Sequence, residues 1–235
     1  MGDYVSLKLA RREVKGVILE SYDNEVVLVK LDSGYNIGIP KTNILGSRVI
    51  KKFKEVNERF KLPDVKGKPK IGLIVTGGTI ASKLDPKTGG VKALTKVEEF
   101  AKYYPKLFEK CDVKIDSPFM KLSEDMNFKD WVKIAESVKK MLDDGEIKGV
   151  IITHGSDTLH YTSSALSFFL GKLNKPVILT FSQRSIDRAS SDAEMNLDCA
   201  VQMALSDCAE VMIVGHATSN DDYCYALKGN KVRKM

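Results

Sequence analysis

The chain has 235 residues, of which 43% are hydrophobic and 29% are charged. This composition is typical of a globular protein and excludes intrinsic disorder, collagen and coiled coil. The longest apolar runs have about five residues, as at 223–227, far short of the roughly 20 that a membrane-spanning helix needs. The four cysteines and three histidines are too scattered for a local zinc motif, and residues 1–16 do not resemble a secretion signal. We therefore expect a metal-free protein of the reducing cytoplasm.

The net charge of +6 is unevenly distributed along the chain. Residues 1–70 hold 15 Lys+Arg against 9 Asp+Glu, whereas the remaining residues hold 22 of each and are neutral. A basic segment beside a neutral one indicates two modules, and the basic one would suit a polyanionic partner such as RNA. A lysine-rich solvated surface gives the same composition, so that alternative stays open.

The N-terminal segment has the pattern of a small all-β domain. Three short β-branched runs are joined by turns containing Asn, Asp and Gly: 14–20, 25–31 and 35–40. Such short strands cannot form a core singly, so we expect them to curl into a small barrel that residues 41–50 complete. Residues 52–70 have the composition of a linker. We therefore predict a small basic β-barrel domain over residues 1–62 and an α/β domain over residues 63–235.

After the linker, predicted strands alternate with predicted helices. Buried-strand patterns occur at 71–75, 113–115, 150–153, 177–181 and 211–214. Thr95 opens a capping box before one helix and Asn127 caps another, with further helices near 161–170 and 192–206. This alternation predicts a Rossmann-like parallel sheet with helices on both faces. The tail, residues 223–232, has the pattern of a hairpin.

Two predicted strands are followed by residues suited to chemistry. In an open parallel sheet, ligands bind beyond the carboxyl ends of the strands. The glycine-rich turn at 76–82 would present the hydroxyl of Thr79 there, and the turn at 153–158 would add Ser156 and Asp157. A glycine-rich turn by itself also suits a nucleotide phosphate. The second hydroxyl with its adjacent carboxylate instead favours nucleophilic catalysis.

A hydroxyl nucleophile needs a base and a group that orients that base. Two lysines compete for the role of base. Lys175 precedes its strand and belongs to the amino edge of the sheet, whereas Lys234 follows the tail hairpin on the carboxyl side. A solvated terminal lysine stays open as the alternative for Lys234. We expect His154 to be structural.

Four motifs in order resemble the L-asparaginase/glutaminase superfamily. They are TGGTIAS at 76–82, SEDM at 123–126, THGSDT at 153–158 and KPVILT at 175–180. The small basic β-domain, the run at 183–197 and VRKM at 232–235 are most similar to the glutaminase subunits of archaeal glutamyl-tRNA(Gln) amidotransferases. The resemblance covers about residues 70–235.

The resemblance implies a role for each matching residue. Thr79 is similar to the threonine that attacks the side-chain amide, after which water hydrolyses the acyl-enzyme. Ser156, Asp157 and Lys234 resemble a second catalytic group, in which lysine activates an alcohol and aspartate holds the lysine. The residues similar to those that grip the substrate's α-carboxylate and α-ammonium are Ser123, Glu124 and Asp157. No cofactor or metal site is implied in this chain.

The same resemblance implies a function in an assembly. Glutamine, or asparagine, would be hydrolysed to supply ammonia for converting Glu-tRNA(Gln) to Gln-tRNA(Gln). ATP and Mg²⁺ would be used by a partner, the E-type subunit of the amidotransferase, and a homodimer of the glutaminase would sit within a heterotetramer. The alternatives are a free L-asparaginase and a non-catalytic nucleotide-binding module.

Three features depart from the family pattern. Ser156 stands where the family usually has threonine, and residues 83–94 lack the tyrosine found there in many asparaginases. The chain ends one residue after Lys234, where the family continues into a C-terminal domain, so we expect that domain to be missing. Without it the pocket would be open to water, and we expect a chain that folds but is not a competent enzyme.

Overall fold

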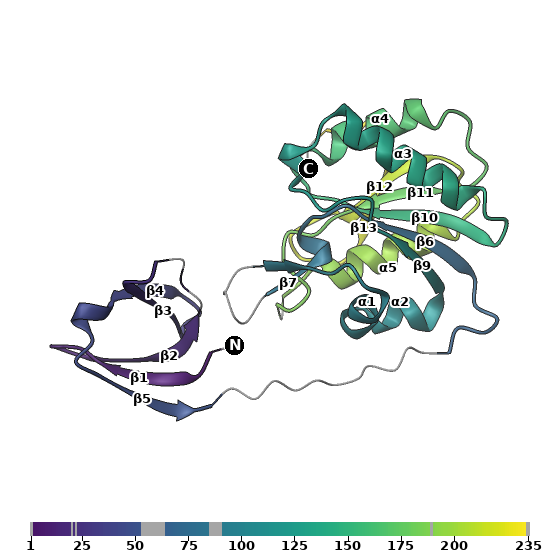
Figure 1. Cartoon of the computed structure of the whole chain (residues 1–235). Helices are drawn as coiled ribbons and strands as arrows, with labels where there is room; N and C mark the ends of the chain where they lie inside the picture. The colour runs from purple at the N-terminus through teal and green to yellow at the C-terminus, as the bar shows by residue number, and fades with distance from the viewer. Residues whose placement is uncertain are drawn as a thin grey trace. The chain divides into compact units, whose positions relative to one another are not determined.

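A computed structural model describes residues 2–19, 21, 23–52, 64–84, 91–188 and 190–233. The chain divides into two compact units, residues 1–59 with 84–92 and residues 60–83 with 93–235 (Figure 1). The boundary predicted between residues 62 and 63 lies within 53–63, outside the described residues, and stays a prediction.

The first unit is a five-stranded antiparallel sheet that curls around a small core (Figure 1). Its strands, in the spatial order β4-β3-β2-β1-β5, are β1 (Tyr4–Lys8), β2 (Glu13–Leu19), β3 (Val26–Leu31), β4 (Asn36–Pro40) and β5 (Gly46–Lys51). A short 3-10 turn, η1 (Lys41–Asn43), joins β4 to β5. The buried core side chains are Val5, Leu7, Val14, Val29 and Ile39. Within the described residues, β4 and β5 are not paired with each other, so the predicted barrel is an open one.

The second unit is built on a six-stranded sheet with the order β13-β12-β11-β10-β6-β9. These strands are β6 (Lys70–Val75), β9 (Asp112–Asp116), β10 (Ile147–Thr153), β11 (Val177–Thr180), β12 (Val211–His216) and β13 (Cys224–Lys228). All neighbours are parallel except β13, which pairs antiparallel with β12. The predicted α/β class is therefore confirmed.

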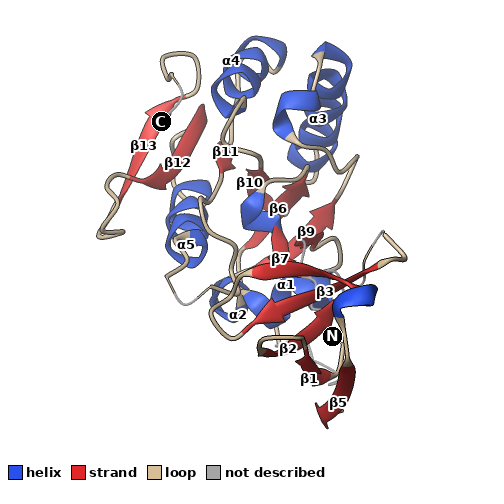
Figure 2. Ribbon diagram, turned by 90° about the vertical axis from the view of Figure 1, so that its left-hand side faces the viewer, coloured by secondary structure: helices blue, strands red, loops and turns tan. Residues whose placement is uncertain are grey.

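Helices cover both faces of this sheet, as Figures 1 and 2 show. On one face lie α3 (Phe128–Leu142) and α4 (Leu159–Phe169). On the other lie α1 (Val97–Tyr103), α2 (Pro105–Lys110) and α5 (Ala193–Ala204). The strands are buried on both sides, because alternate residues pack into separate cores on the two faces. In the part of the chain that is described, every helix is too short or too polar to cross a bilayer.

The capping of α3 is as the sequence predicts. The Asn127 side chain accepts from the backbone N–H of Lys129 (3.0 Å), and the Asp130 carboxylate accepts from the backbone N–H of Asn127 (3.0 Å). Lys121 Nζ lies 2.9 Å from both oxygens of Asp130. The capping box thereby anchors the loop before α3 as well as the helix itself.

Two local predictions were wrong. The residue preceding α1 is Lys96 rather than Thr95, and the backbone N–H of Thr95 donates to the side chain of Glu99 (3.3 Å). In the tail, β13 does not form a hairpin with Val232; it pairs with β12, and Val232 packs against the core outside any strand. A two-stranded sheet of β7 (Ser82–Leu84) and β8 (Val91–Ala93) was not predicted from the sequence.

Candidate active site

The turn after β6 is shaped by two glycines. Gly77 and Gly78 have φ angles of 136° and 83°, which side-chain-bearing residues rarely adopt. A Cβ at Gly77 would lie 2.3 Å from the carbonyl oxygen of Lys121, and one at Gly78 would lie 2.4 Å from that of His154. The half-buried Thr79 then begins the 3-10 turn η2 (Thr79–Ala81). Its backbone position is therefore set by close contact with two other loops.

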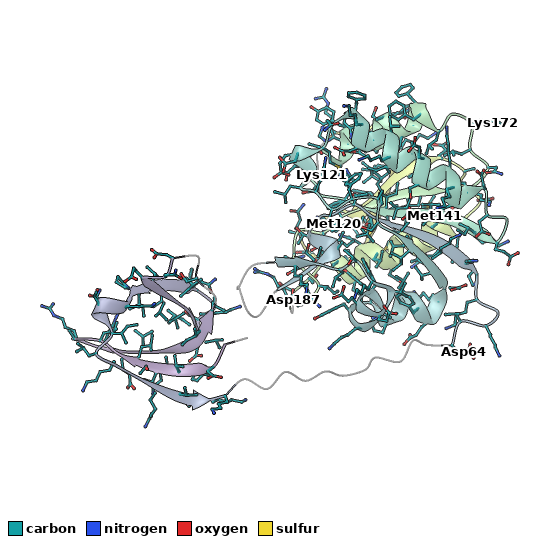
Figure 3. All side chains as sticks on the ribbon, in the orientation of Figure 1. Asp64, Met120, Lys121, Met141, Lys172 and Asp187 are labelled. Atoms are coloured by element: carbon teal, nitrogen blue, oxygen red, sulfur yellow. The ribbon has the colours of Figure 1, made fainter. Side chains whose placement is uncertain are left out.

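These three loops follow β6, β9 and β10 and are bonded to one another. Thr76 Oγ1 donates to the carbonyl of Thr153 (2.7 Å), and the backbone N–H of Lys121 donates to the carbonyl of Thr76 (3.0 Å). Thr158 Oγ1 donates to the carbonyl of Ser123 (2.7 Å). The loops that carry the motif residues therefore form one edge of the sheet. In Figure 3, Lys121 marks this carboxyl edge, whereas Lys172, before β11, lies at the opposite end.

The residues singled out from the sequence differ in exposure at this edge. Ser123, in the 3-10 turn η3 (Ser123–Asp125), is 2% exposed, and its Oγ donates to the Glu124 carboxylate (3.3 Å). Glu124 and Asp157 are exposed, and Ser156 is half-buried. The carboxylates are thus accessible to a charged ligand, whereas the hydroxyl of Ser123 is held in the packed part of the edge.

A cavity with room for about one water molecule (about 10 Å³) adjoins Ser156. Val232 and Arg233 line it together with His160 and Phe181. Lys234, the residue singled out as the base, lies outside the described residues.

His154 is held in a buried position behind the site. Its Nδ1–H donates to the carbonyl of Gly155 (2.8 Å), and Thr162 Oγ1 donates to its Nε2 (2.8 Å). Burial lowers the pKa of His154 to about 4, although the bond to Gly155 favours the charged form. The imidazole is therefore neutral at neutral pH, and both nitrogens are occupied in supporting the turn.

The amino edge of the sheet differs in its bonding. Lys175 Nζ donates to the carbonyls of Leu142 (2.8 Å) and Asp144 (2.9 Å), at the ends of α3 and of the turn that follows it. Lys175 therefore holds the turn after α3, at the edge of the sheet opposite to the motif residues.

A buried carboxylate that was not singled out from the sequence organises the neighbouring strand ends. Asp192 is fully buried and accepts from the backbone N–H groups of Gln183 and Arg184, both at 2.9 Å. Asn196 Nδ2 (3.0 Å) and His216 Nδ1 (2.9 Å) also donate to it. Burial opposes ionisation, but the backbone N–H groups, those of Gln183 and Arg184 first, together with His216 outweigh it and lower the pKa of Asp192.

This network ties together the ends of β11 and β12 and the start of α5. Its signal in the sequence is the run at 183–197, in which no role was assigned to Asp192. Arg184 also forms an ion pair with Asp221, whose φ of 55° is in the left-handed region. Over the ranges that are described, no three His, Cys, Asp or Glu side chains gather in a group that could hold a metal ion.

Comparison with known proteins matches both parts of the chain. Residues 70–235 match the family described as "Asparaginase, N-terminal", and residues 1–50 match the "GatD N-terminal domain". The chain is 46% identical over 245 residues to the D-type subunit of the glutamyl-tRNA(Gln) amidotransferase of Pyrococcus furiosus, covering 100% of this chain and 56% of that protein. It is 47% identical to the corresponding subunit of Thermococcus kodakarensis, covering 94% of this chain and 51% of that protein. The chain thus spans about half the length of these relatives.

Solved structures agree with this assignment. The thermostable L-asparaginase from Thermococcus kodakarensis is 27% identical, with a TM-score of 0.57 over 71% of this chain and 58% of that one. L-asparaginase I from Vibrio cholerae is 31% identical, with a TM-score of 0.58 over 72% of this chain and 49% of that one. Because the family match covers residues 70–235 and the TGGT and THGSDT turns are both present, the chain belongs to the asparaginase family.

Proposed function

We propose that this chain carries the nucleophile half of a glutaminase that supplies ammonia within a glutamyl-tRNA(Gln) amidotransferase. The observation that carries the proposal is the convergence of the three motif loops, bearing Thr79, Ser123 and Ser156, on one edge of the sheet. That edge is where an open parallel sheet binds its ligand. The similarity of the whole chain to D-type amidotransferase subunits of two archaea supports the amidotransferase setting.

The proposed reaction uses Thr79 as the attacking group. Its Oγ adds to the side-chain amide carbon of glutamine, the C–N bond breaks, and ammonia leaves with the proton that the hydroxyl gives up. Water then hydrolyses the ester, which releases glutamate and regenerates Thr79. Ser156, Asp157 and Lys234 form the second catalytic group, which transfers the protons. A positioned relay of this kind contributes about 10²–10⁴-fold to the rate.

Substrate binding in this proposal depends on opposite charges. The exposed carboxylates of Glu124 and Asp157 suit the α-ammonium of glutamine, whereas the Ser123 hydroxyl suits its α-carboxylate. Asparagine presents the same α-groups and a shorter side chain, so the two amides compete for one site.

The ammonia would pass to a partner subunit of the amidotransferase, which activates the glutamyl ester of the tRNA with ATP and Mg²⁺. We assign this partner as the E-type subunit, with a homodimer of this protein in a heterotetramer, acting in the cytoplasm where charged tRNA is used. The chain itself takes glutamine and no cofactor. The excess of basic residues before residue 71 supports a role for the first unit in engaging the tRNA or the partner.

The test is ammonia release from glutamine and from asparagine. It is measured on this chain, and on a chimera in which the part of the Pyrococcus furiosus relative beyond the matched region follows residue 235, each with and without partner and Glu-tRNA(Gln). The proposal expects glutamine hydrolysis by the chimera that rises when partner and charged tRNA are present. Asparagine hydrolysis indifferent to both additions would indicate a free asparaginase. No hydrolysis under any condition, with nucleotide binding retained, would indicate the non-catalytic alternative.

A further inference from the structure

Two cysteines outside the proposed active site lie between α5 and the edge strand β13. Cys199 is near the middle of α5, and Cys224 is the first residue of β13. Both side chains are half-buried, and both pack against the core on the α5 face of the sheet. The proposed reaction uses neither of them.

The geometry places the two cysteines on facing parts of α5 and β13. Asn196 and Cys199 are three residues apart on α5 and therefore lie on the same face of the helix. Cys224 Sγ donates to Asn196 Oδ1 (3.5 Å), one helical turn from Cys199, and the neighbouring Cys199 thiol contributes to the raised pKa of the Cys224 thiol. A helix and a strand distant in sequence thus place two half-buried thiols near each other on the same side of the sheet.

We propose that Cys199 and Cys224 form a dithiol that a small disulfide, such as oxidised glutathione, converts to an intramolecular disulfide joining α5 to β13. The thiolate of one cysteine attacks the glutathione disulfide, which forms a mixed disulfide and releases one glutathione thiolate. The thiolate of the other cysteine then attacks the protein-side sulfur and releases the second glutathione. Two protein thiols thus lose two electrons and two protons, and one glutathione disulfide gains them.

The environment of the pair makes this oxidation slow at neutral pH. Burial, and then the contact with Cys199, raise the pKa of the Cys224 thiol. Only the thiolate attacks a disulfide, so the reactive form of Cys224 is scarce at pH 7 and increases about tenfold with each pH unit. The oxidation rate should therefore rise steeply between pH 7 and pH 9.

The other two cysteines provide internal controls. Cys111 is fully buried, and burial raises the pKa of its thiol to about 11. Cys208 Sγ lies 3.5 Å from the sulfur of Met212, a thioether that cannot form a disulfide. Neither has the thiol neighbour that Cys224 has in Cys199.

The disulfide would join the edge strand to a helix whose first turn belongs to the Asp192 network. β13 is an edge strand that pairs in the sheet with β12 alone, so a covalent link to α5 would restrain it on a second side. A disulfide between Cys199 and Cys224 closes the chain between them into a loop and so restricts the unfolded state. We therefore expect the melting temperature of the oxidised protein to be about 5–10 °C higher than that of the reduced protein.

The experiment treats the folded 235-residue chain with oxidised glutathione at pH 7 and at pH 9, then counts free thiols with a maleimide mass tag under denaturing conditions. We expect the number of free thiols to fall from four to two, faster at pH 9, in a monomer lighter by two hydrogens. Proteolysis should yield one peptide pair linked through Cys199 and Cys224. The C111S/C208S variant should behave like the parent, whereas C199S and C224S should each accumulate only the mixed disulfide with glutathione.

Three results would overturn the proposal. The first is four free thiols after oxidation at pH 9 in a protein that keeps its native circular dichroism. The second is a cross-link that involves Cys111 or Cys208, or one that joins two chains. The third is an intramolecular disulfide that still forms in C199S or in C224S. If either serine variant fails to fold, the peptide map of the parent and of C111S/C208S still decides between these results and the expected one.

Discussion

The two edges of the sheet in the second unit are built from different kinds of polar interaction. At the carboxyl edge, polar groups are buried and bonded to backbone: Thr76 Oγ1 to Thr153, and Asp192 to the N–H groups of Gln183 and Arg184. At the amino edge, the Asp144 carboxylate forms surface ion pairs, with Lys114 at 3.1 Å among them, and accepts from the exposed backbone N–H of Glu146. Buried polar groups fix positions because leaving them without partners is costly, whereas surface ion pairs contribute little. The buried bonds of Thr76 and Asp192 therefore fix the loops at the carboxyl edge more firmly than the ion pairs of Asp144 fix the amino edge.

The largest expected effect comes from removing the hydroxyl of Thr79. In the chimera described above, Thr79→Val should lower glutamine hydrolysis by at least ~10³-fold, because the attacking oxygen is lost while shape is kept. Thermal melting should stay close to that of the parent. A variant that retains more than about a tenth of the parental rate would remove Thr79 from the role of nucleophile.

The second effect is a difference in turnover between variants of charged residues at the two edges. In the same chimera, Asp157→Asn and Lys234→Met should each lower turnover by about 10²-fold or more. The turnover of the double variant should be only a little below that of the less active single variant. Members of one relay fail together, so their losses do not multiply. Lys175→Met, at the amino edge, is the matched control and should keep turnover within a few fold. Multiplying losses would instead assign Asp157 and Lys234 to independent roles.

The third effect compares one carboxylate from each edge by the same substitution. Asp192→Asn should lower the free energy of unfolding by about 3 kcal/mol, because both carboxylate oxygens accept from N–H groups and an amide NH₂ would face donors. Asp144→Asn should cost less than about 1 kcal/mol, because its partners are surface lysines and the exposed backbone N–H of Glu146, from which the asparagine oxygen can still accept. Urea unfolding measures both. Equal losses would mean that the edges are not distinguished by burial.

The fourth effect is a pH dependence located at the carboxyl edge. The pKa of His154 in the folded protein is about 4, below the value of about 6.5 in an unfolded chain. Between these values the unfolded state binds the proton and the folded state does not, so stability falls as the pH drops from 6.5 to 4. The loss approaches about 3 kcal/mol. His154→Gln should flatten the curve of unfolding free energy against pH in this window. An unchanged slope would assign the dependence to other groups.

Local pattern predicted most of the elements of the second unit. Runs of apolar residues located β6, β10, β11 and β12, and Asn127 located the start of α3. The same reasoning gave the wrong residue at the start of α1, because the glutamate that reaches the backbone N–H of Thr95 is Glu99, four residues along and not three. Phe128, the first residue of α3, is apolar and yet 62% exposed. Periodicity gives the spacing of a face but not its exact rotation toward the core.

The parts of the site that escaped prediction depend on contacts distant in sequence. Thr79 and Ser156 could be placed because each directly follows a strand, and parallel strands share an edge. Asp192 could not, because it sits at the start of a helix and one of its donors is His216, which arrives from β12. The pairing of β13 with β12 was missed for the same reason.

The close approach of Gly78 to His154 also bears on how the site opens. A loop that touches its neighbour through bare backbone has no side chain that can move aside, so neither loop can shift alone. The loops after β6 and β10 should therefore open as one cooperative unit. In amide hydrogen exchange, the N–H of Lys121, which bonds to Thr76, and the N–H of His154, which bonds to Thr180, would then share a single opening free energy. The half-buried Thr79 and Ser156, the two hydroxyls of the proposed site, would then become fully exposed to solvent in a single event.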